Sequence, residues 1–356
     1  MNEHELAILR QFCLDAEPAS CTPYGCGHIN RTYLVATAGG RCYILQKINH
    51  HTFRDVAGLM ENIELVTEHL RRKSPDPRSV LTLIRTKDGK SYLEADDGYW
   101  RVFRFVEDSI CLQQPESDAD FYESAVGFGT FQQLLSDFPA EKLHETIPNF
   151  HNTPDRYRAF HETLTRDPMH RAAQVQPEIE FALARQAEMA ALQNALDAGE
   201  LPLRVTHNDT KLNNVLFDAK TRRALCIIDL DTVMPGSALY DYGDSIRFGA
   251  ATAAEDEREL DKMEMSLERF RVFTRGYVRA CPGLTAKELE LLPMGAKTMT
   301  MECGVRFLTD YLDGDHYFAV HRDGQNLDRA RTQFKLVADM EKKWDEMRKI
   351  VEEESR

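Results

Sequence analysis

The sequence predicts an α+β fold of two lobes, a small antiparallel β lobe followed by a larger, mainly helical lobe. Residues 20–108 read mostly as short strands separated by turns, whereas apolar residues after Glu107 recur at helical spacing. The chain of 356 residues is also long enough for each lobe to bury a core of its own. We therefore expect lobes at 1–108 and 109–356, joined by a hinge at about 105–109.

The β lobe is expected to begin with a short helix over 3–15. Strands are then predicted at 32–37, 42–48, 80–86, 91–95 and 99–106. The first two would form a hairpin around the turn at 38–41, and the next two a hairpin around 87–90, because both turns contain glycine. One helix over 56–72 has apolar residues at helical spacing and is inserted after the strand at 42–48, the third strand if a first one begins near residue 20.

The second lobe reads as helices with a single pair of strands. The helices are predicted at 118–137, 155–166, 177–198, 257–280, 285–312 and 327–353. The strand pair lies at about 215–229. A ligand site between the two lobes is the natural place for chemistry.

Composition excludes several classes of partner. Lys and Arg number 44 against 58 Asp and Glu, a net charge of −14, which argues against a nucleic-acid or anionic-membrane surface. No run of apolar residues is long enough to span a bilayer, and the acidic start of the chain lacks the features of a signal peptide. Eight scattered cysteines without a CxxC pair do not indicate a disulfide framework. We expect a cytoplasmic protein with small-molecule ligands and no implied protein partner.

The most informative segment carries polar residues around a short hairpin. The strands at 215–218 and 224–229 are joined by a five-residue loop, so pairing Asp218 with Ala224 places Asn214 opposite Ile228, next to Asp229. An amide oxygen and a carboxylate would thus meet at the open end of the hairpin. Such hard oxygen ligands suit Mg²⁺. The loop before the hairpin supplies a further carboxylate, Asp209, which can accept a proton from an attacking hydroxyl.

This spacing is typical of phosphoryl transfer in protein-kinase-like enzymes. His207, Asp209 and Asn214 fit the pattern H-x-D-x-x-x-x-N, and Asp229 follows at the end of the next strand. Lys211 stands where such kinases often place a cation near the transferred phosphate. The alternative is an ordinary loop with an Asn cap, which would need four polar residues to meet this spacing by chance.

The β lobe offers weaker support for a nucleotide site. Gly25 and Gly27 precede a strand and would let backbone N–H groups approach a phosphate, although two glycines also suit an ordinary turn. In the third strand Gln46 stands where kinases usually place a phosphate-binding Lys, and Lys47 would point to the other face of the sheet. Glu64 is the candidate partner on the following helix.

Glu61 is a second candidate on that helix, and both glutamates could equally belong to a solvated helix face. In the second lobe, the run 241–247 is expected to organise the floor of the site, where Asp241 or Asp244 can cap backbone N–H groups at a helix start. Arg247 would pair with a buried carboxylate.

With these residues in view, nearly the whole chain resembles the aminoglycoside-phosphotransferase and choline-kinase group of small-molecule kinases, and within it the N-acetylhexosamine 1-kinases. The segments that carry the resemblance are 23–30, 203–214, 227–232, 234–237, 243–250 and 301–308. The wider group often has H-G-D-x-H-x-x-N, whereas this chain has Asn208 and Lys211, as the hexosamine kinases do.

The resemblance implies a bilobal protein-kinase-like fold that uses ATP and Mg²⁺. The implied reaction transfers the γ-phosphate to the anomeric C1 hydroxyl of N-acetylglucosamine or N-acetylgalactosamine. On this basis Asp209 is the base and also contacts the substrate, and Asn214 with Asp229 holds the metal. Phe105 and Glu107 would belong to a hinge that meets adenine.

The acceptor pocket is expected in the helical lobe, where Arg306 can reach oxygens of the sugar and Tyr317 can pack on its ring. Asp231 is a further candidate for the substrate or a second metal, or it simply closes the strand. Alternatively, Arg306 pairs with Asp310 one helical turn on, and Tyr317 is ordinary packing.

The sequence leaves the acceptor itself open. The acidic residues Asp310, Asp313 and Asp315 suggest either a cationic aminoglycoside or a solvated helix end. The same motifs would also suit a kinase for an amino alcohol or for another sugar, and a nucleotide-binding pseudokinase.

Overall fold

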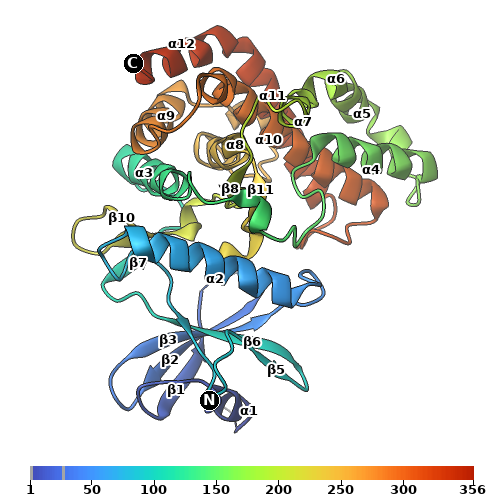
Figure 1. Cartoon of the computed structure of the whole chain (residues 1–356). Helices are drawn as coiled ribbons and strands as arrows, with labels where there is room; N and C mark the ends of the chain where they lie inside the picture. The colour runs from blue at the N-terminus through green and yellow to red at the C-terminus, as the bar shows by residue number, and fades with distance from the viewer. Residues whose placement is uncertain (1–2, 26–28) are drawn as a thin grey trace.

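The computed structural model describes residues 3–25 and 29–356 and confirms the predicted fold class. Figure 1 shows a twisted β-sheet at the N-terminal end, helix α2 lying across it, and a larger helical lobe beyond α2 that contains the C-terminus. The sheet has the strand order β1-β2-β3-β6-β4, with β5 also paired to β6. Helix α2 therefore lies between the N-terminal sheet and the helical lobe.

The N-terminal sheet buries apolar residues on both faces. Its strands are β1 (Pro18–Pro23), β2 (Arg31–Thr37), β3 (Cys42–Ile48), β4 (Leu83–Ile84), β5 (Leu93–Ala95) and β6 (Gly98–Arg104). Leu45 and Val102 pack on one face with Leu9 of helix α1 (Glu3–Leu9), whereas Ile48 and Phe103 belong to the core that includes α2 (Val56–Lys73). Alternate residues thus point to opposite faces, as the strand geometry requires.

Two predictions for this lobe need correction. The hairpin around 38–41 and the helix at 56–72 are confirmed, but the strands at 80–86 and 91–95 do not pair with each other. Instead β4 and β5 both pair with β6, end to end along the same edge, so they cannot also lie side by side. The first helix ends at Leu9 rather than at residue 15, and Phe12 makes an isolated bridge to Thr86.

Helix α2 is anchored to the second lobe through a buried asparagine. Asp55 caps its N-terminus by accepting a hydrogen bond from the backbone N–H of Gly58. Asn62 is fully buried, and its amide donates to the carbonyl oxygens of His144 and Val233 at 2.8 and 3.0 Å. These bonds hold α2 in one position relative to the helical lobe.

The second lobe is mainly helical, as predicted. Its helices are α3 (Asp118–Leu134), α4 (Thr153–Arg166), α5 (Gln176–Leu183), α6 (Gln186–Met189), α7 (Ala191–Asp197), α8 (Ala238–Gly249), α9 (Leu267–Ala280), α10 (Ala286–Asp313), α11 (Gln325–Lys342) and α12 (Trp344–Glu354). The expected helix at 177–198 is divided into three, the one at 327–353 breaks at Lys343, and the one at 257–280 begins only at Leu267.

Helix α8 has no counterpart in the predictions and forms the centre of this lobe. Its close contact with α10 depends on two glycines, because a Cβ on Gly243 would lie 2.3 Å from the backbone oxygen of Gly295. The long helix α10 starts with a capping box between Thr285 and Glu288. The close approach of α8 and α10 fixes the acidic residues of α8 beneath the loop described below.

The predicted strand pair is confirmed as β9 (Val215–Asp218) and β10 (Ala224–Ile227), which form a sheet with β7 (Ser109–Cys111). A register shift near Ala224 moves its partner to Phe217, but beyond it the predicted register holds. The backbone N–H of Ile228 donates to the carbonyl of Asn214 at 2.9 Å. The expected neighbours therefore meet at the open end of the hairpin.

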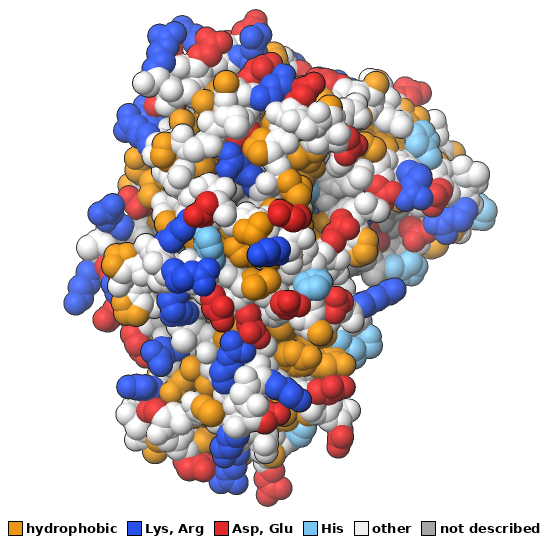
Figure 2. Space-filling view, viewed as in Figure 1, with side chains coloured by type: hydrophobic (Ala, Val, Ile, Leu, Met, Phe, Trp, Pro, Cys, Tyr) orange, Lys and Arg blue, Asp and Glu red, His pale blue; other side chains and the backbone are white. Residues whose placement is uncertain are grey.

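Charged side chains of both signs are interspersed over the face of the molecule seen in Figure 2. Within the described ranges, no helix is both long and apolar enough to cross a membrane. None of the seven cysteines in these ranges forms a disulfide.

Candidate active site

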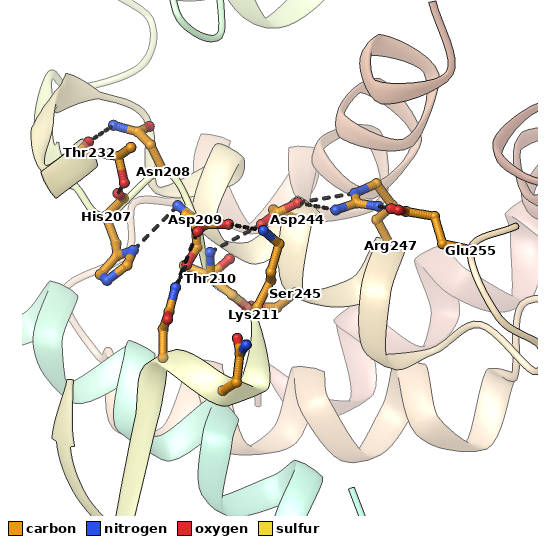
Figure 3. A network of polar contacts seen from close by, with 12 residues as sticks. His207, Asn208, Asp209, Thr210, Lys211, Thr232, Asp244, Ser245, Arg247 and Glu255 are labelled. Atoms are coloured by element: carbon orange, nitrogen blue, oxygen red, sulfur yellow. Dashed lines mark hydrogen bonds and ion pairs between the residues drawn. The ribbon is translucent and has the colours of Figure 1, made fainter. Parts of the chain in front are cut away.

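The candidate site is built on the loop that follows strand β8 (Arg204–Thr206), which pairs with β11 (Met234–Gly236). Figure 3 shows this loop beside α8, with Asp244 and Ser245 of the helix pointing toward it. Asp241 accepts hydrogen bonds from the backbone N–H groups of His207 and Asn208 at 2.9 and 2.8 Å. Asp244 accepts from that of Thr210 at 3.0 Å. The two carboxylates therefore fix the loop from below, and they cap its backbone instead of the helix start that the sequence suggested.

His207 supports the loop from within the core. Its Nδ1 accepts from the backbone N–H of Asp209 at 3.3 Å, so its Nε2 carries the proton and donates to the carbonyl of Ile228 at 2.9 Å. The side chain is fully buried between the rings of Phe128 and Phe131. His207 therefore joins the loop to the end of β10 and does not itself face a ligand.

The next residues of the loop place a carboxylate, an amine and an amide together. Oδ1 of Asp209 lies 2.8 Å from Nζ of Lys211, and its Oδ2 accepts from Nδ2 of Asn214 at 3.3 Å. Nδ2 of Asn214 also donates to the backbone oxygen of Asp209 at 2.8 Å, which leaves the amide oxygen as the group that Asn214 can offer to a ligand. The Asp209 carboxylate raises the pKa of Lys211 above its usual range, so the amine is charged.

Lys211 belongs to a longer row of alternating charges. Asp244 accepts from Nε and Nη2 of Arg247 at 3.0 and 2.9 Å, and Arg247 also pairs with Glu255 at 2.8 Å (Figure 3). Although burial opposes it, the charges of Arg247 and Lys211 lower the pKa of Asp244. Arg247 thus pairs with a buried carboxylate, as expected, and Asp244 is ionised beneath Lys211.

Asp229 lies at the end of β10 in a left-handed backbone conformation, with φ at +59°, and Asn208 has a similar φ of +64°. Such conformations are uncommon for residues other than glycine and are concentrated at functional sites. Surrounding protein atoms and the charges of Asp231 and Asp209 raise the pKa of Asp229. Its side chain is exposed, however, and contact with solvent limits that shift.

The donor set fits a magnesium ion that also binds phosphate. Within the described ranges, no three His, Cys, Asp or Glu residues form a group that could hold a metal by themselves. Asn214 offers an amide oxygen and Asp229 a carboxylate at the end of the hairpin where Ile228 bonds to Asn214. Mg²⁺ is usually bound through one or two protein ligands, with water and phosphate completing the shell. Asp229 also carries a raised pKa that a bound cation would lower.

In the N-terminal lobe, the structure gives the predicted nucleotide residues other partners. Gly25 has φ of +78°, a conformation that favours glycine, whereas Gly27 lies outside the described residues. Lys47 pairs with Asp97 at 2.6 Å, and Glu64 pairs with Arg85 at 2.9 Å. The lysine–glutamate pair of kinases is thus not formed by these residues.

Glu61 pairs with His144 at 2.7 Å, so the second candidate on α2 is also engaged elsewhere. At the predicted hinge, the backbone N–H of Phe105 donates to Cys42, and Glu107 is exposed. The ring of Phe105 makes an edge contact with Tyr24, at 6.0 Å between centroids.

An arginine that sequence reasoning missed stands beside Gln46. Arg101 on β6 is the cross-strand partner of Gln46, and its Nε donates to Gln46 Oε1 at 2.9 Å. Its Nη1 lies 2.6 Å from Oδ1 of Asp231, while Asn30 donates to Oδ2 of the same carboxylate at 2.6 Å. Both oxygens of Asp231 are therefore engaged by the N-terminal lobe.

Arg306 and Tyr317 lie together in the helical lobe. Nη2 of Arg306 donates to the Tyr317 hydroxyl at 3.4 Å, and its guanidinium also lies against the rings of Phe150 and Phe318, at 5.3 and 5.5 Å from their centroids. Asp310 does not pair with Arg306; it accepts hydrogen bonds from the backbone of residues 316–318. The guanidinium keeps donors that a ligand could use.

The two other acidic residues of this region are neutralised. Asp313 pairs with Arg166 at 3.0 Å, and Asp315 pairs with Arg171 at 2.8 Å. With Asp310 also satisfied, the three acidic residues are engaged within the fold.

Comparisons with known proteins identify the family and the fold. A sequence profile of the phosphotransferase enzyme family matches residues 20–272, and the chain belongs to this family. Among solved structures, an aminoglycoside phosphotransferase from Alicyclobacillus acidocaldarius covers 98% of this chain and 96% of its own, at 12% identity and a TM-score of 0.60. A microcompartment-associated aminopropanol kinase covers 97% and 98%, at 16% identity and a TM-score of 0.61. A choline kinase from Cryptosporidium parvum covers 97% and 96%, at 12% identity and a TM-score of 0.60.

At these identities the structural likeness establishes the fold, a protein-kinase-like arrangement of two lobes. Family membership identifies the chain as a small-molecule kinase. The acceptor is a separate question.

Proposed function

We propose that the protein transfers the γ-phosphate of ATP to the anomeric C1 hydroxyl of a free N-acetylhexosamine, in a Mg²⁺-dependent reaction that gives the sugar 1-phosphate. The observation that carries the proposal is the polar network of Asp209, Lys211 and Asn214, with Asp229 within electrostatic reach of Asp209. The sequence resemblance to hexosamine kinases specifies the acceptor.

Each residue of this network has a task in the proposed reaction. Asp209 accepts the proton of the C1 hydroxyl, and Lys211 supplies positive charge next to the transferred phosphate. Asn214 and Asp229 hold the metal, which when bound neutralises charge on the phosphates. The nucleotide is held between lobes 1–108 and 109–356, with adenine against the backbone of Phe105–Glu107.

The surroundings of Arg306 favour a neutral sugar acceptor. Its guanidinium can donate to hydroxyl or acetamido oxygens, and the aromatic rings around it can pack on a sugar ring. Arg306 also acts electrostatically on Glu302, whose partner His151 contacts the backbone oxygen of Asn208, the residue before Asp209. A cationic acceptor would be repelled by Arg306, and the three nearby acidic residues are already paired.

The proposal is tested by ATP consumption over a panel of sugars, aminoglycosides and amino alcohols, followed by phosphorus NMR of the product. We expect turnover with N-acetylglucosamine or N-acetylgalactosamine and a phosphate signal on C1. Methyl glycosides of these sugars have the C1 oxygen blocked and should not react. Turnover with choline or an aminoglycoside instead, or phosphate on C6, would contradict the proposal.

A further inference from the structure

Protein kinases place on strand β3 a lysine that binds the nucleotide phosphates and pairs with a glutamate on the adjacent helix. This chain has Gln46 at the corresponding place on β3, and the neighbouring Lys47 pairs with Asp97 on the other side of the sheet. Glu64 of α2 pairs with Arg85. These residues therefore do not form the lysine–glutamate pair in this chain.

The inner face of the sheet carries one buried cation at this place. Arg101 is the cross-strand partner of Gln46 and Gln46 that of Thr32, so the three side chains form a row across β6, β3 and β2. Nε of Arg101 donates to Oε1 of Gln46 at 2.9 Å, and Nε2 of Gln46 donates to Thr32 Oγ1 at 3.1 Å. The glutamine thus orients the guanidinium instead of binding a phosphate.

Arg101 directs its charge at the second lobe. Its Nη1 lies 2.6 Å from Oδ1 of Asp231, with 1% of the arginine side chain and 3% of the aspartate side chain exposed. The other carboxylate oxygen accepts from Nδ2 of Asn30 at 2.6 Å, and Oδ1 of Asn30 accepts from the backbone N–H of Asn49. Side chains from β6 and from the segment before β2 therefore converge on one carboxylate of the helical lobe.

The position of Asp231 links this pair to the metal site. It lies two residues after Asp229, in the short 3₁₀ turn Leu230–Thr232 that begins directly after Asp229. Thr232 of the same turn donates to the carbonyl of His207 at 2.7 Å and accepts from the side chain of Asn208 through its own carbonyl at 2.8 Å. The turn is thus fixed between the N-terminal lobe and the loop that carries Asp209.

We propose that the Arg101–Asp231 ion pair, in a chain without the lysine–glutamate pair, holds the turn after Asp229 in the arrangement that binds Mg²⁺ and nucleotide. Arg101 is a positioning residue in this assignment, since it acts through Asp231 and is too buried to meet a phosphate in this conformation. The inference rests on the proposed function only in taking Mg²⁺-nucleotide as the ligand.

Energetics favour a positioning role over a purely stabilising one. A fully buried ion pair contributes little net stability, because desolvation of both charges offsets their attraction, whereas removing one partner leaves an unpaired buried charge. Residues that orient a metal ligand from behind commonly change metal affinity by about 10–100-fold when they are replaced. The two effects can therefore be separated by comparing single and double variants.

The experiment measures binding of Mg²⁺ with the non-hydrolysable analogue AMP-PNP by calorimetry, and the midpoint of urea denaturation, for four variants. These are Arg101→Met, Asp231→Asn, the double variant, and Arg41→Met as the control at an exposed arginine in the turn between β2 and β3. We expect each single variant to bind Mg²⁺-AMP-PNP roughly 10–100-fold more weakly and to be less stable. The double variant should regain most of the stability and none of the affinity, and Arg41→Met should match the wild type.

Wild-type affinity in Arg101→Met, or recovery of stability and affinity together in the double variant, would overturn the inference. The binding measurement needs no acceptor. If the wild type binds Mg²⁺-AMP-PNP but phosphorylates no N-acetylhexosamine, the proposed function fails while the binding data still decide the role of Arg101.

Discussion

His151 and Glu302 form a buried pair that connects the long helix α10 to the loop carrying Asp209. Nδ1 of His151 lies 2.8 Å from Oε1 of Glu302, and its Nε2 lies 3.2 Å from the backbone oxygen of Asn208. Each ring nitrogen of His151 therefore faces an acceptor. Burial favours the uncharged form of Glu302, but His151 and Arg306 lower its pKa below the usual value and keep the carboxylate charged.

The first prediction concerns this pair. Replacing His151 by Leu leaves the Glu302 charge buried with only the hydroxyl of Thr153 as a donor, so we expect a loss of about 3–5 kcal/mol in the free energy of unfolding. Urea denaturation measures it. The double variant His151→Leu with Glu302→Gln should recover part of the loss, and an equally unstable double variant would show that the charge is not responsible.

The second prediction tests the base. Asp209→Asn should lower turnover by roughly 10²–10⁴-fold, the range for loss of a positioned general base, while nucleotide binding stays close to that of the wild type. Steady-state kinetics with calorimetry of AMP-PNP binding separates the two effects. The control is Asp261→Asn at an exposed aspartate on a distant 3₁₀ turn. Turnover within about threefold of the wild type would remove Asp209 from this role.

A third prediction addresses the metal. Asp229→Ala removes the only carboxylate of the proposed pair and leaves Asn214 as a neutral ligand, so Mg²⁺-dependent activity should be lost. A titration with Mg²⁺ at fixed ATP checks this expectation. Saturation at the wild-type concentration and rate would mean that the metal binds elsewhere.

The fourth prediction concerns Asp97, which pairs with Lys47 of strand β3. Burial raises the pKa of Asp97, but hydrogen bonds from Lys47, Trp100 and His4 outweigh this effect and lower the pKa to about 2. In the unfolded chain an aspartate has a pKa of about 3.9, so the folded state is stabilised above that pH and loses the stabilisation as pH falls through about 2. Asp97→Asn should therefore lower the urea midpoint at neutral pH.

The difference between Asp97→Asn and the wild type should shrink below about pH 4 and disappear near pH 2. Denaturation curves across this range measure it, with the neighbouring exposed Asp96→Asn as the control. A difference that is independent of pH would point to lost packing instead of lost charge.

The hairpin at the site was predictable from the sequence because its register depends on local features. A short loop between two apolar strands determines which residues face each other, and the expected neighbours Asn214 and Ile228 are hydrogen-bonded. Helix α8 was not predictable in this way. It is buried on almost every side, and its polar residues Asp241 and Asp244 face the loop instead of solvent, so it does not show the usual contrast between an exposed polar face and a buried apolar face.

Arg101 escaped the sequence reasoning for a related reason. Its role depends on a cross-strand neighbour, Gln46, and on Asp231 in the other lobe, and no spacing along the chain relates the three. The sequence shows that position 46 carries glutamine instead of lysine. Identifying Arg101 as its neighbour required the register between β3 and β6. Pairing across lobes is a property of the folded chain alone.

The last prediction concerns the acceptor, because the proposed choice of sugar depends on the role given to Arg306. Its guanidinium is held over Phe150, Tyr317 and Phe318, a position from which it can donate to the acetamido oxygen of an N-acetylhexosamine. A site that binds such a group by hydrogen bonds discriminates strongly against analogues that lack it.

Arg306→Met keeps a long apolar side chain among the rings but removes the donors. We expect the KM for N-acetylglucosamine to rise by roughly tenfold or more, because a lost hydrogen bond to a charged group costs about 1.5–3 kcal/mol. The KM for ATP should stay unchanged, and the preference for N-acetylglucosamine over glucose should fall in the variant. Kinetics with both sugars measure this, and Arg329→Met, at an arginine that lies over Phe307, is the matched control. An unchanged sugar preference in Arg306→Met would place the acetamido contact elsewhere in the helical lobe.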